Sequence, residues 1–149
     1  MFALHTNIRA NNIEEGQHIA TMAIVHGFAE NSDIHLESAI QYALNGFDVH
    51  LIDLRGYGMS AGFRMTNNRI HDFHYDVTSL LQQVNPKLPL FIYGHSMGGL
   101  TVCTYLLNNA GLNITGAILS APLLYFSDLK PIDDSKKLVV THLAPHLEV

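Results

Sequence analysis

The sequence predicts an α/β fold, with a mostly parallel β-sheet and helices on both of its faces. Short, continuous apolar runs alternate along the chain with segments in which apolar residues recur every three to four positions. Gly, Pro and Asn punctuate the boundaries between these segments. The chain has 149 residues, 48% of them hydrophobic, which is enough for one packed core but not for two domains. We expect about four to five core strands and three main helices.

The first clear strand is Ala20 to Val25, a continuous apolar run typical of a strand that is covered on both faces. A helix follows, for which Ser32 is a suitable N-cap. Apolar residues recur on one helical face from Leu36 to Leu44, and Asn45-Gly46 ends the helix. Residues 3–9 are expected to add one antiparallel edge strand.

Phe47 to Leu54 is the next predicted strand, and it leads into a glycine-punctuated loop over residues 55–62. This loop lacks the Lys-Ser/Thr ending of a P-loop and the third glycine of a dinucleotide-binding motif, so we expect no nucleotide cofactor there. Apolar residues from Ile70 to Val84 then fall on one helical face, and Asn85-Pro86 ends this second helix.

The most informative pattern follows this helix. Pro89 to Tyr93 fits a buried strand, Gly94-His95-Ser96-Met97-Gly98 has the form G-x-S-x-G, and apolar positions from Leu100 to Leu107 continue as one helical face up to Gly111. A strand, a sharp turn and a helix in this order are the setting of a nucleophile elbow. In such a turn a serine stands above the sheet at strained backbone angles.

This setting predicts acyl-transfer chemistry at Ser96, whose hydroxyl would attack an ester or amide carbonyl. The backbone N–H of Met97, at the start of the helix, would point toward the oxyanion that develops. A second donor is needed, and the loop after the first strand lies at the same sheet edge. We therefore expect the backbone N–H of Phe28 to be that donor, with Gly27 allowing the close approach.

Five residues are expected to support the elbow and its loops, and Gly27, named above, is one of them. Gly94 and Gly98 leave room for the neighbouring strand and helix to approach. His26 is expected to hydrogen-bond the adjoining turn, and His95 to be a buried packing or hydrogen-bonding residue. Neither histidine is assigned as the catalytic base.

The last confident strand is Ile114 to Ser120, which Pro122 ends. Four such strands alternating with three helices imply right-handed crossovers and a parallel sheet. Beyond it the pattern weakens, since residues 128–134 are loop-like and residues 135–147 could begin another helix.

Composition excludes several classes of function. A net charge of -5 without a basic stripe argues against nucleic acid as a partner. The ten histidines are scattered singly, without metal-ligand spacing, so no metal is expected and most should be surface or half-buried side chains. Examples are His5, His18, His35, His50 and His74.

Cys103 is the only cysteine, so it forms no intramolecular disulfide, and its place on an apolar helical face predicts a packed thiol. Residues 1–10 contain no signal-peptide core, and no apolar run is long enough to span a membrane. We expect an intracellular protein, cytoplasmic or peripherally membrane-associated, and its oligomeric state stays open.

Four segments resemble the successive landmarks of the α/β-hydrolases. They are His26-Gly27-Phe28-Ala29-Glu30-Asn31-Ser32, Asp53-Leu54-Arg55-Gly56-Tyr57-Gly58-Met59-Ser60, Gly94-His95-Ser96-Met97-Gly98-Gly99 and Ile118-Leu119-Ser120-Ala121-Pro122. The most similar branch is the monoacylglycerol lipase and lysophospholipase group, also classified as the serine aminopeptidase S33 type, and the resemblance covers about residues 3–149. The chain departs from it at Glu30-Asn31, where the family usually has Glu-His.

This resemblance implies that Ser96 is the nucleophile and that the amides of Phe28 and Met97 form the oxyanion hole. It implies that Asp53 and Arg55 brace loops near the site, and that neither a metal nor a cofactor is needed.

The triad acid and base are not identifiable from the sequence. In this fold they follow the nucleophile in the order Asp or Glu, then His. The later candidates lie where the family's lid begins: Asp128, Asp133, Asp134, His142 and His146. We therefore assign residues 1–126 to the N-terminal part of the hydrolase core and residues 127–149 to the start of a lid or cap. As given, the chain should lack most catalytic power.

The leading hypothesis is a serine hydrolase that cleaves carboxylic esters of lipids, of the monoacylglycerol or lysophospholipid type, through an acyl-Ser96 intermediate. Its partner would be a small-molecule acyl ester, and peripheral contact with a membrane stays open. One alternative is a peptidase or short-chain carboxylesterase of the same fold. The other is a non-catalytic hydrolase remnant or binding module.

Overall fold

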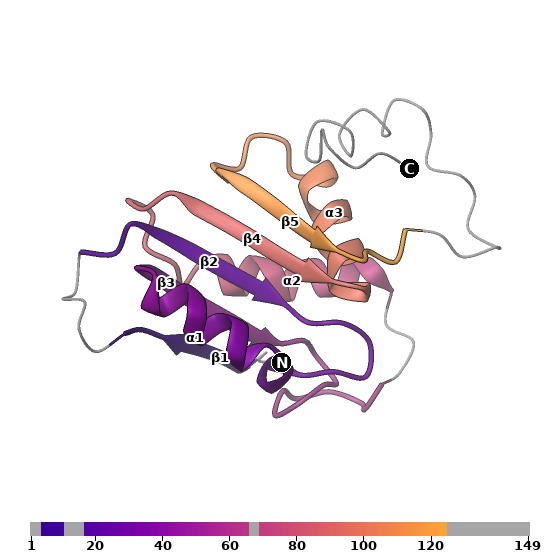
Figure 1. Ribbon diagram of the computed structural model, residues 1–149. Coiled ribbons are helices and arrows are strands. Elements are labelled where there is room, and N and C mark those ends of the chain that lie inside the picture. The colour runs from indigo at the N-terminus through magenta and orange to yellow at the C-terminus, as the bar shows by residue number, and fades with distance from the viewer. Residues whose placement is uncertain (1–3, 11–16, 66–68, 125–149) are drawn as a thin grey trace.

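The computed structural model describes residues 4–10, 17–65 and 69–124, which form a five-stranded sheet in the order β1-β3-β2-β4-β5 (Figure 1). The strands are β1 (Leu4–Ile8), β2 (Ala20–Val25), β3 (Phe47–Asp53), β4 (Leu90–His95) and β5 (Gly116–Ser120). The helices are α1 (Leu36–Leu44), α2 (Ile70–Leu81) and α3 (Met97–Asn108), and a 3-10 turn, η1 (Ser32–His35), precedes α1. Only β1 pairs antiparallel to its neighbour. The predicted α/β class and the antiparallel edge strand are both confirmed.

Strand β2 lies in the middle of the sheet and brings the loops of the site together. Val25, its last residue, pairs with Ile52 of β3 and with Gly94 of β4. The carboxyl ends of these parallel strands therefore meet at one edge of the sheet, which is where open α/β sheets place their ligands.

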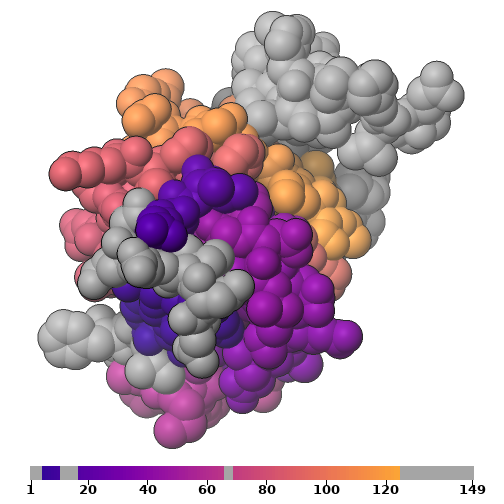
Figure 2. Space-filling model, turned by 60° about the vertical axis from the view of Figure 1, so that its left-hand side comes forward, coloured from indigo at the N-terminus to yellow at the C-terminus, as the bar shows by residue number. Residues whose placement is uncertain are grey.

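The helices form a layer on each face of the sheet (Figure 1). Under α1, a cluster of buried side chains combines Met22 and Ile24 of β2 with Val49 and Leu51 of β3. On the opposite face, a larger cluster joins α2 and α3 to the other side chains of the same strands. Figure 2 turns the amino-terminal ends of the parallel strands toward the viewer and shows the residues of α1 in purple. All residues of β2 are buried, which confirms the prediction of a strand covered on both faces.

The start of the first helix was predicted wrongly. Ser32 is not the N-cap but the first residue of η1, and its side chain makes no capping bond. Its backbone N–H donates to Asp53 Oδ1 at 2.8 Å instead, so a contact with the last residue of β3 decides how the chain enters the helix at Leu36. A bond between segments this far apart in sequence leaves no local signal.

The ends of one other helix and of three strands differ by one to three residues from the predicted ends. Helix α2 ends at Leu81 rather than Val84, because the N–H of Gln83 bonds back three residues to Leu80 and tightens the last turn. Strand β5 begins at Gly116 rather than Ile114. Strand β3 ends one residue earlier than predicted, and β4 runs two residues further, through the first two residues of the G-x-S-x-G pattern.

The expectation of surface or half-buried histidines was wrong for His18, His35 and His50, all of which are buried. His50 shows why: its ring stacks on His5, with centroids 4.9 Å apart, and its Nε2 lies 3.2 Å from Asp48 Oδ2. A histidine ring can be buried in a sheet when polar groups pair with its nitrogens. The spacing of single histidines along the sequence does not reveal such partners.

Asp48 ties the edge strand β1 to β3. Burial alone would raise the pKa of this carboxyl, but hydrogen bonds from Arg9, Asn7 and His50 outweigh burial and hold the pKa well below its usual range. The Arg9 Nε to Asp48 Oδ1 distance is 2.9 Å. Cys103 is buried as predicted, and burial raises the pKa of its thiol.

The predicted lid segment, residues 127–149, and the helix expected over residues 135–147 lie outside the described residues. The same holds for all later acid and base candidates: Asp128, Asp133, Asp134, His142 and His146. Over the ranges that are described, no helix is both long and apolar enough to cross a lipid bilayer.

The packing of α3 against β2 gives the first testable prediction. A Cβ at Gly98 would press on the carbonyl oxygens of Val25 and His26, and backbone atoms of a central strand do not move aside cheaply. We expect Gly98→Ala to lower the free energy of unfolding by about 3 kcal/mol, measured by urea denaturation. Gly116→Ala is the control, because its Cβ would meet only the Phe91 ring, at 3.1 Å. Equal losses in both variants would contradict the packing argument.

Candidate active site

Ser96 occupies the turn between β4 and α3 in a strained backbone conformation, with φ 50° and ψ -115°. Main-chain bonds hold it there: its N–H donates to Ser120 O at 2.9 Å, and its C=O accepts from the N–H groups of Leu100 and Leu123, each at 3.0 Å. The side chain is half-buried. Its hydroxyl forms no hydrogen bond with any group in the described part of the chain.

Glycines make the turn possible. A Cβ at Gly94 would lie 2.6 Å from Gly98 O, so the end of β4 and the start of α3 approach too closely for any side chain. A Cβ at Gly27 would lie 3.2 Å from Ser96 Cβ. The structure therefore brings Gly27, Gly94 and Gly98 together around Ser96.

The two expected oxyanion donors directly follow residues of the elbow region: Met97 follows Ser96, and Phe28 follows Gly27. Met97 is the first residue of α3, where backbone N–H groups have no partner within the helix and the helix dipole favours negative charge. Phe28 directly follows Gly27, and its ring meets the Tyr57 ring edge-on at 6.2 Å. Their joint role as an oxyanion hole stays a prediction.

His26 is fully engaged by backbone groups. Its Nδ1 donates to Gly27 O at 2.7 Å, and its Nε2 accepts from the N–H of Leu54 at 3.0 Å. Burial lowers its pKa, against smaller opposing effects of the Gly27 carbonyl and Asp53. A neutral ring with both nitrogens occupied joins the loops after β2 and β3, and it has no lone pair free to accept a proton.

His95 was expected to be buried, and this is wrong, because its side chain is 31% exposed. Helix α1 lies over β1 and β3, so it leaves the same face of β4 less covered. The Nδ1 of His95 lies 3.2 Å from Ser120 Oγ, and its Nε2 lies 3.7 Å from Glu30 Oε1. His95 thus connects three loops at the sheet edge.

Sequence reasoning missed Glu30 and His35 as site residues. Glu30 Oε2 accepts the N–H of Gly27 at 2.7 Å and lies 3.4 Å from His35 Nε2. Burial lowers the pKa of His35, while Glu30 opposes this effect. A carboxylate three residues after a glycine, able to close a tight turn, was the available signal for Glu30. His35 had none, because its position depends on η1.

Asp53 braces two loops from a buried position. Its Oδ1 accepts the N–H of Ser32 and its Oδ2 accepts the N–H of Met59, both at 2.8 Å. Arg55, two residues on, donates to Asp76 at 2.8 Å, and this bond is the largest cause of the raised pKa of its guanidinium. These acidic groups therefore serve the backbone and an ion pair.

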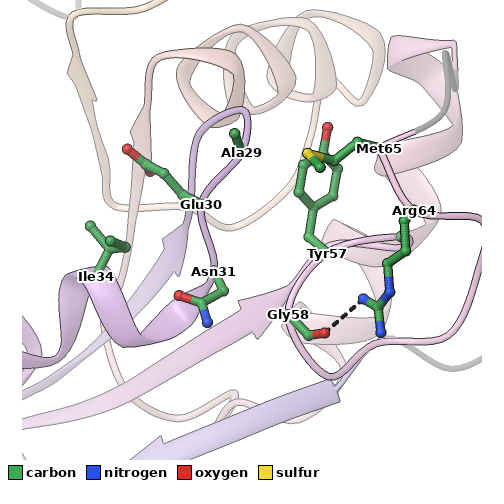
Figure 3. Close-up of a pocket in the computed structure, with 9 residues that line it drawn as sticks. Ala29, Glu30, Asn31, Ile34, Tyr57, Gly58, Arg64 and Met65 are labelled. Atoms are coloured by element: carbon green, nitrogen blue, oxygen red, sulfur yellow. Dashed lines mark hydrogen bonds between the residues drawn. The ribbon is translucent and has the colours of Figure 1, made fainter.

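A cavity of about 320 Å³ lies between the loops after β2 and β3 (Figure 3). Ala29, Glu30, Asn31, Ile34, Gly56, Tyr57, Gly58, Arg64 and Met65 line it, so it adjoins the elbow without containing Ser96. Arg64 donates to Gly58 O at 2.7 Å. Across residues 4–10, 17–65 and 69–124, no three His, Cys, Asp or Glu side chains are grouped so as to hold a metal ion.

Comparison with known proteins matches residues 16–149 to the family described as serine aminopeptidase, S33. The monoacylglycerol lipase of Mycolicibacterium smegmatis is 30% identical over 132 residues, which is 86% of this chain and 47% of that enzyme. The human monoglyceride lipase is 34% identical over 113 residues, which is 70% of this chain and 35% of that enzyme.

Among solved structures, the monoacylglycerol lipase of Paleococcus ferrophilus superimposes with a TM-score of 0.70 and 24% identity. The match covers 99% of this chain and 52% of that enzyme. The similarity therefore extends over nearly all of this chain, which spans about half or less of the length of these relatives.

Backbone strain at Ser96 gives the second prediction. Holding a residue with a Cβ in this conformation costs about 1 to 3 kcal/mol, whereas glycine adopts it without strain. Glycine also makes the unfolded chain more flexible, which lowers stability by about 0.4 to 1 kcal/mol. We expect Ser96→Gly to be more stable than Ser96→Ala by about 1 kcal/mol in urea denaturation. Both variants lack the hydroxyl, so an equal or reversed order would show that the turn stores no strain.

Proposed function

Because this chain belongs to the serine aminopeptidase S33 family of α/β-hydrolases, we propose that it is a serine hydrolase of lipid carboxylic esters, of the monoacylglycerol or lysophospholipid type. The observation that carries the proposal is the hydroxyl of Ser96, unpartnered among the described residues and held on a strained turn beside the N-terminus of α3. Backbone strain of this kind persists only where the surrounding structure enforces it, and strained residues cluster at active sites.

The proposed reaction begins when Ser96 Oγ attacks the ester carbonyl carbon and loses its proton to a general base. The carbonyl oxygen becomes an oxyanion, which the N–H groups of Phe28 and Met97 stabilise. Expulsion of the alcohol leaves an acyl-Ser96 ester, and water then releases the fatty acid and restores the serine. The base and its orienting carboxylate are proposed to come from outside the described residues, since both ring nitrogens of His26 serve backbone groups.

The choice of substrate class rests on the relatives. Two of them are named monoacylglycerol or monoglyceride lipases, and a third is named a probable lysophospholipase. We propose that residues 1–126 belong to the hydrolase core and residues 127–149 to the start of a lid. Because one fold hosts many functions, the fold alone does not decide the substrate.

The third prediction tests the nucleophile. In the full-length product of the gene, we expect Ser96→Ala to abolish labelling by a fluorophosphonate probe and to reduce hydrolysis of a monoacylglycerol by at least about 10³-fold. Ser38→Ala is the matched control, because Ser38 is an exposed serine on α1 and should change neither readout. Labelling that survives Ser96→Ala would refute the assignment, and a parent protein that is not labelled at all would favour a non-catalytic binding module.

The fourth prediction tests the second oxyanion donor. Phe28→Pro removes the backbone N–H, and loss of one such donor lowers kcat by about 10²- to 10³-fold. Phe28→Ala keeps the N–H and removes only a half-exposed ring, so its kcat should stay within about threefold of the parent. Equal activities of the two variants would place the donor on another residue.

A further inference from the structure

We propose that Glu30 is a positioning residue for the oxyanion hole, acting through the N–H of Gly27 to fix the main chain that presents Phe28 beside Ser96. The inference rests on the proposed function, because it depends on the Phe28 amide being a donor. Glu30 itself would touch neither the substrate nor the reacting atoms.

The first argument is the geometry of the turn after β2. The side chain of Glu30 reaches back three residues, and its Oε2 accepts the N–H of Gly27 at 2.7 Å. Ala29, inside this turn, has φ 59°, a left-handed conformation that costs a residue with a Cβ about 1 to 2 kcal/mol. The turn therefore needs an interaction that closes it, and the carboxylate supplies one. A charged acceptor makes this bond stronger than one between neutral groups.

The second argument is that Gly27 separates Glu30 from the nucleophile. A Cβ built on Gly27 would lie 3.0 Å from Glu30 Oε2 and 3.2 Å from Ser96 Cβ. The carboxylate, the glycine and the serine are thus in successive contact. A shift of Gly27 would change the gap between Phe28 and Ser96, and a displacement of about 1 Å in a catalytic geometry can cost about 10²-fold in rate.

The third argument is that the carboxylate lies close to two histidine rings. His35 Nε2 lies 3.4 Å from Glu30 Oε2, and His95 Nε2 lies 3.7 Å from Glu30 Oε1. His95 in turn contacts Ser120 at the end of β5. Figure 3 shows the Glu30 side chain turned away from Arg64, so the carboxylate does not face the guanidinium across the cavity.

The fifth prediction compares three variants of the full-length protein in the hydrolysis of a p-nitrophenyl ester. Glu30→Ala removes the acceptor, and we expect kcat to fall about 10- to 100-fold with KM unchanged. Glu30→Gln keeps a carbonyl oxygen that can accept the Gly27 N–H, so it should restore kcat to within about threefold of the parent. Glu37→Ala, which removes an exposed acid on α1, should leave both constants unchanged.

The melting temperature of each variant and the labelling of Ser96→Ala complete the design. Recovery by glutamine but not by alanine, at matched melting temperatures, supports the proposal. It is overturned if alanine and glutamine give the same kcat, if KM alone changes, or if kcat falls only together with the melting temperature. Labelling of Ser96→Ala at the parent's rate would instead defeat the proposed function, and the two failures are therefore distinguishable.

Discussion

The structure depends on the close approach of α3 to the central strands at the start of that helix. No side chain fits between Gly98 and the carbonyl oxygens of β2 and its following residue, and none fits between Gly94 and Gly98. With the two backbones in contact, the one residue left to connect strand to helix, Ser96, is forced to a positive φ. The strained turn at Ser96 is thus a consequence of packing, because the larger of the two buried clusters, which includes α2 and α3, offsets the cost of the strain.

The loops around this turn are ordered mainly by polar side chains that bind backbone groups. His26 joins the loop after β2 to the loop after β3, Asp53 accepts an N–H from each of two segments, and Glu30 accepts one from Gly27. His26 and Asp53 are buried, and buried polar groups cost free energy unless they are paired, as both are here. The titratable residues near the elbow therefore hold the loops in place, and their proximity to Ser96 is not by itself evidence of catalysis.

Most of the fold followed from the sequence, because it is encoded by local patterns. The period of apolar residues located every main helix and strand, and G-x-S-x-G between a strand and a helix located the turn at Ser96. What could not be predicted depends on contacts between distant segments. Ser32 bonds to Asp53 instead of capping a helix, His35 is buried by a turn with no signature, and the exposure of His95 depends on where α1 lies across the sheet.

The proposed serine hydrolase mechanism needs both main-chain geometry and a side chain that accepts a proton. The strained turn at Ser96 and the N–H groups at the start of α3 arise from the sheet and its first loops alone, since both are properties of main-chain geometry. A general base is different, because it needs a free nitrogen within reach of Ser96. Among the described residues, His26 has none, and His95 is directed toward Ser120 and Glu30. On the proposed mechanism, the proton of Ser96 therefore passes to a group outside the described residues.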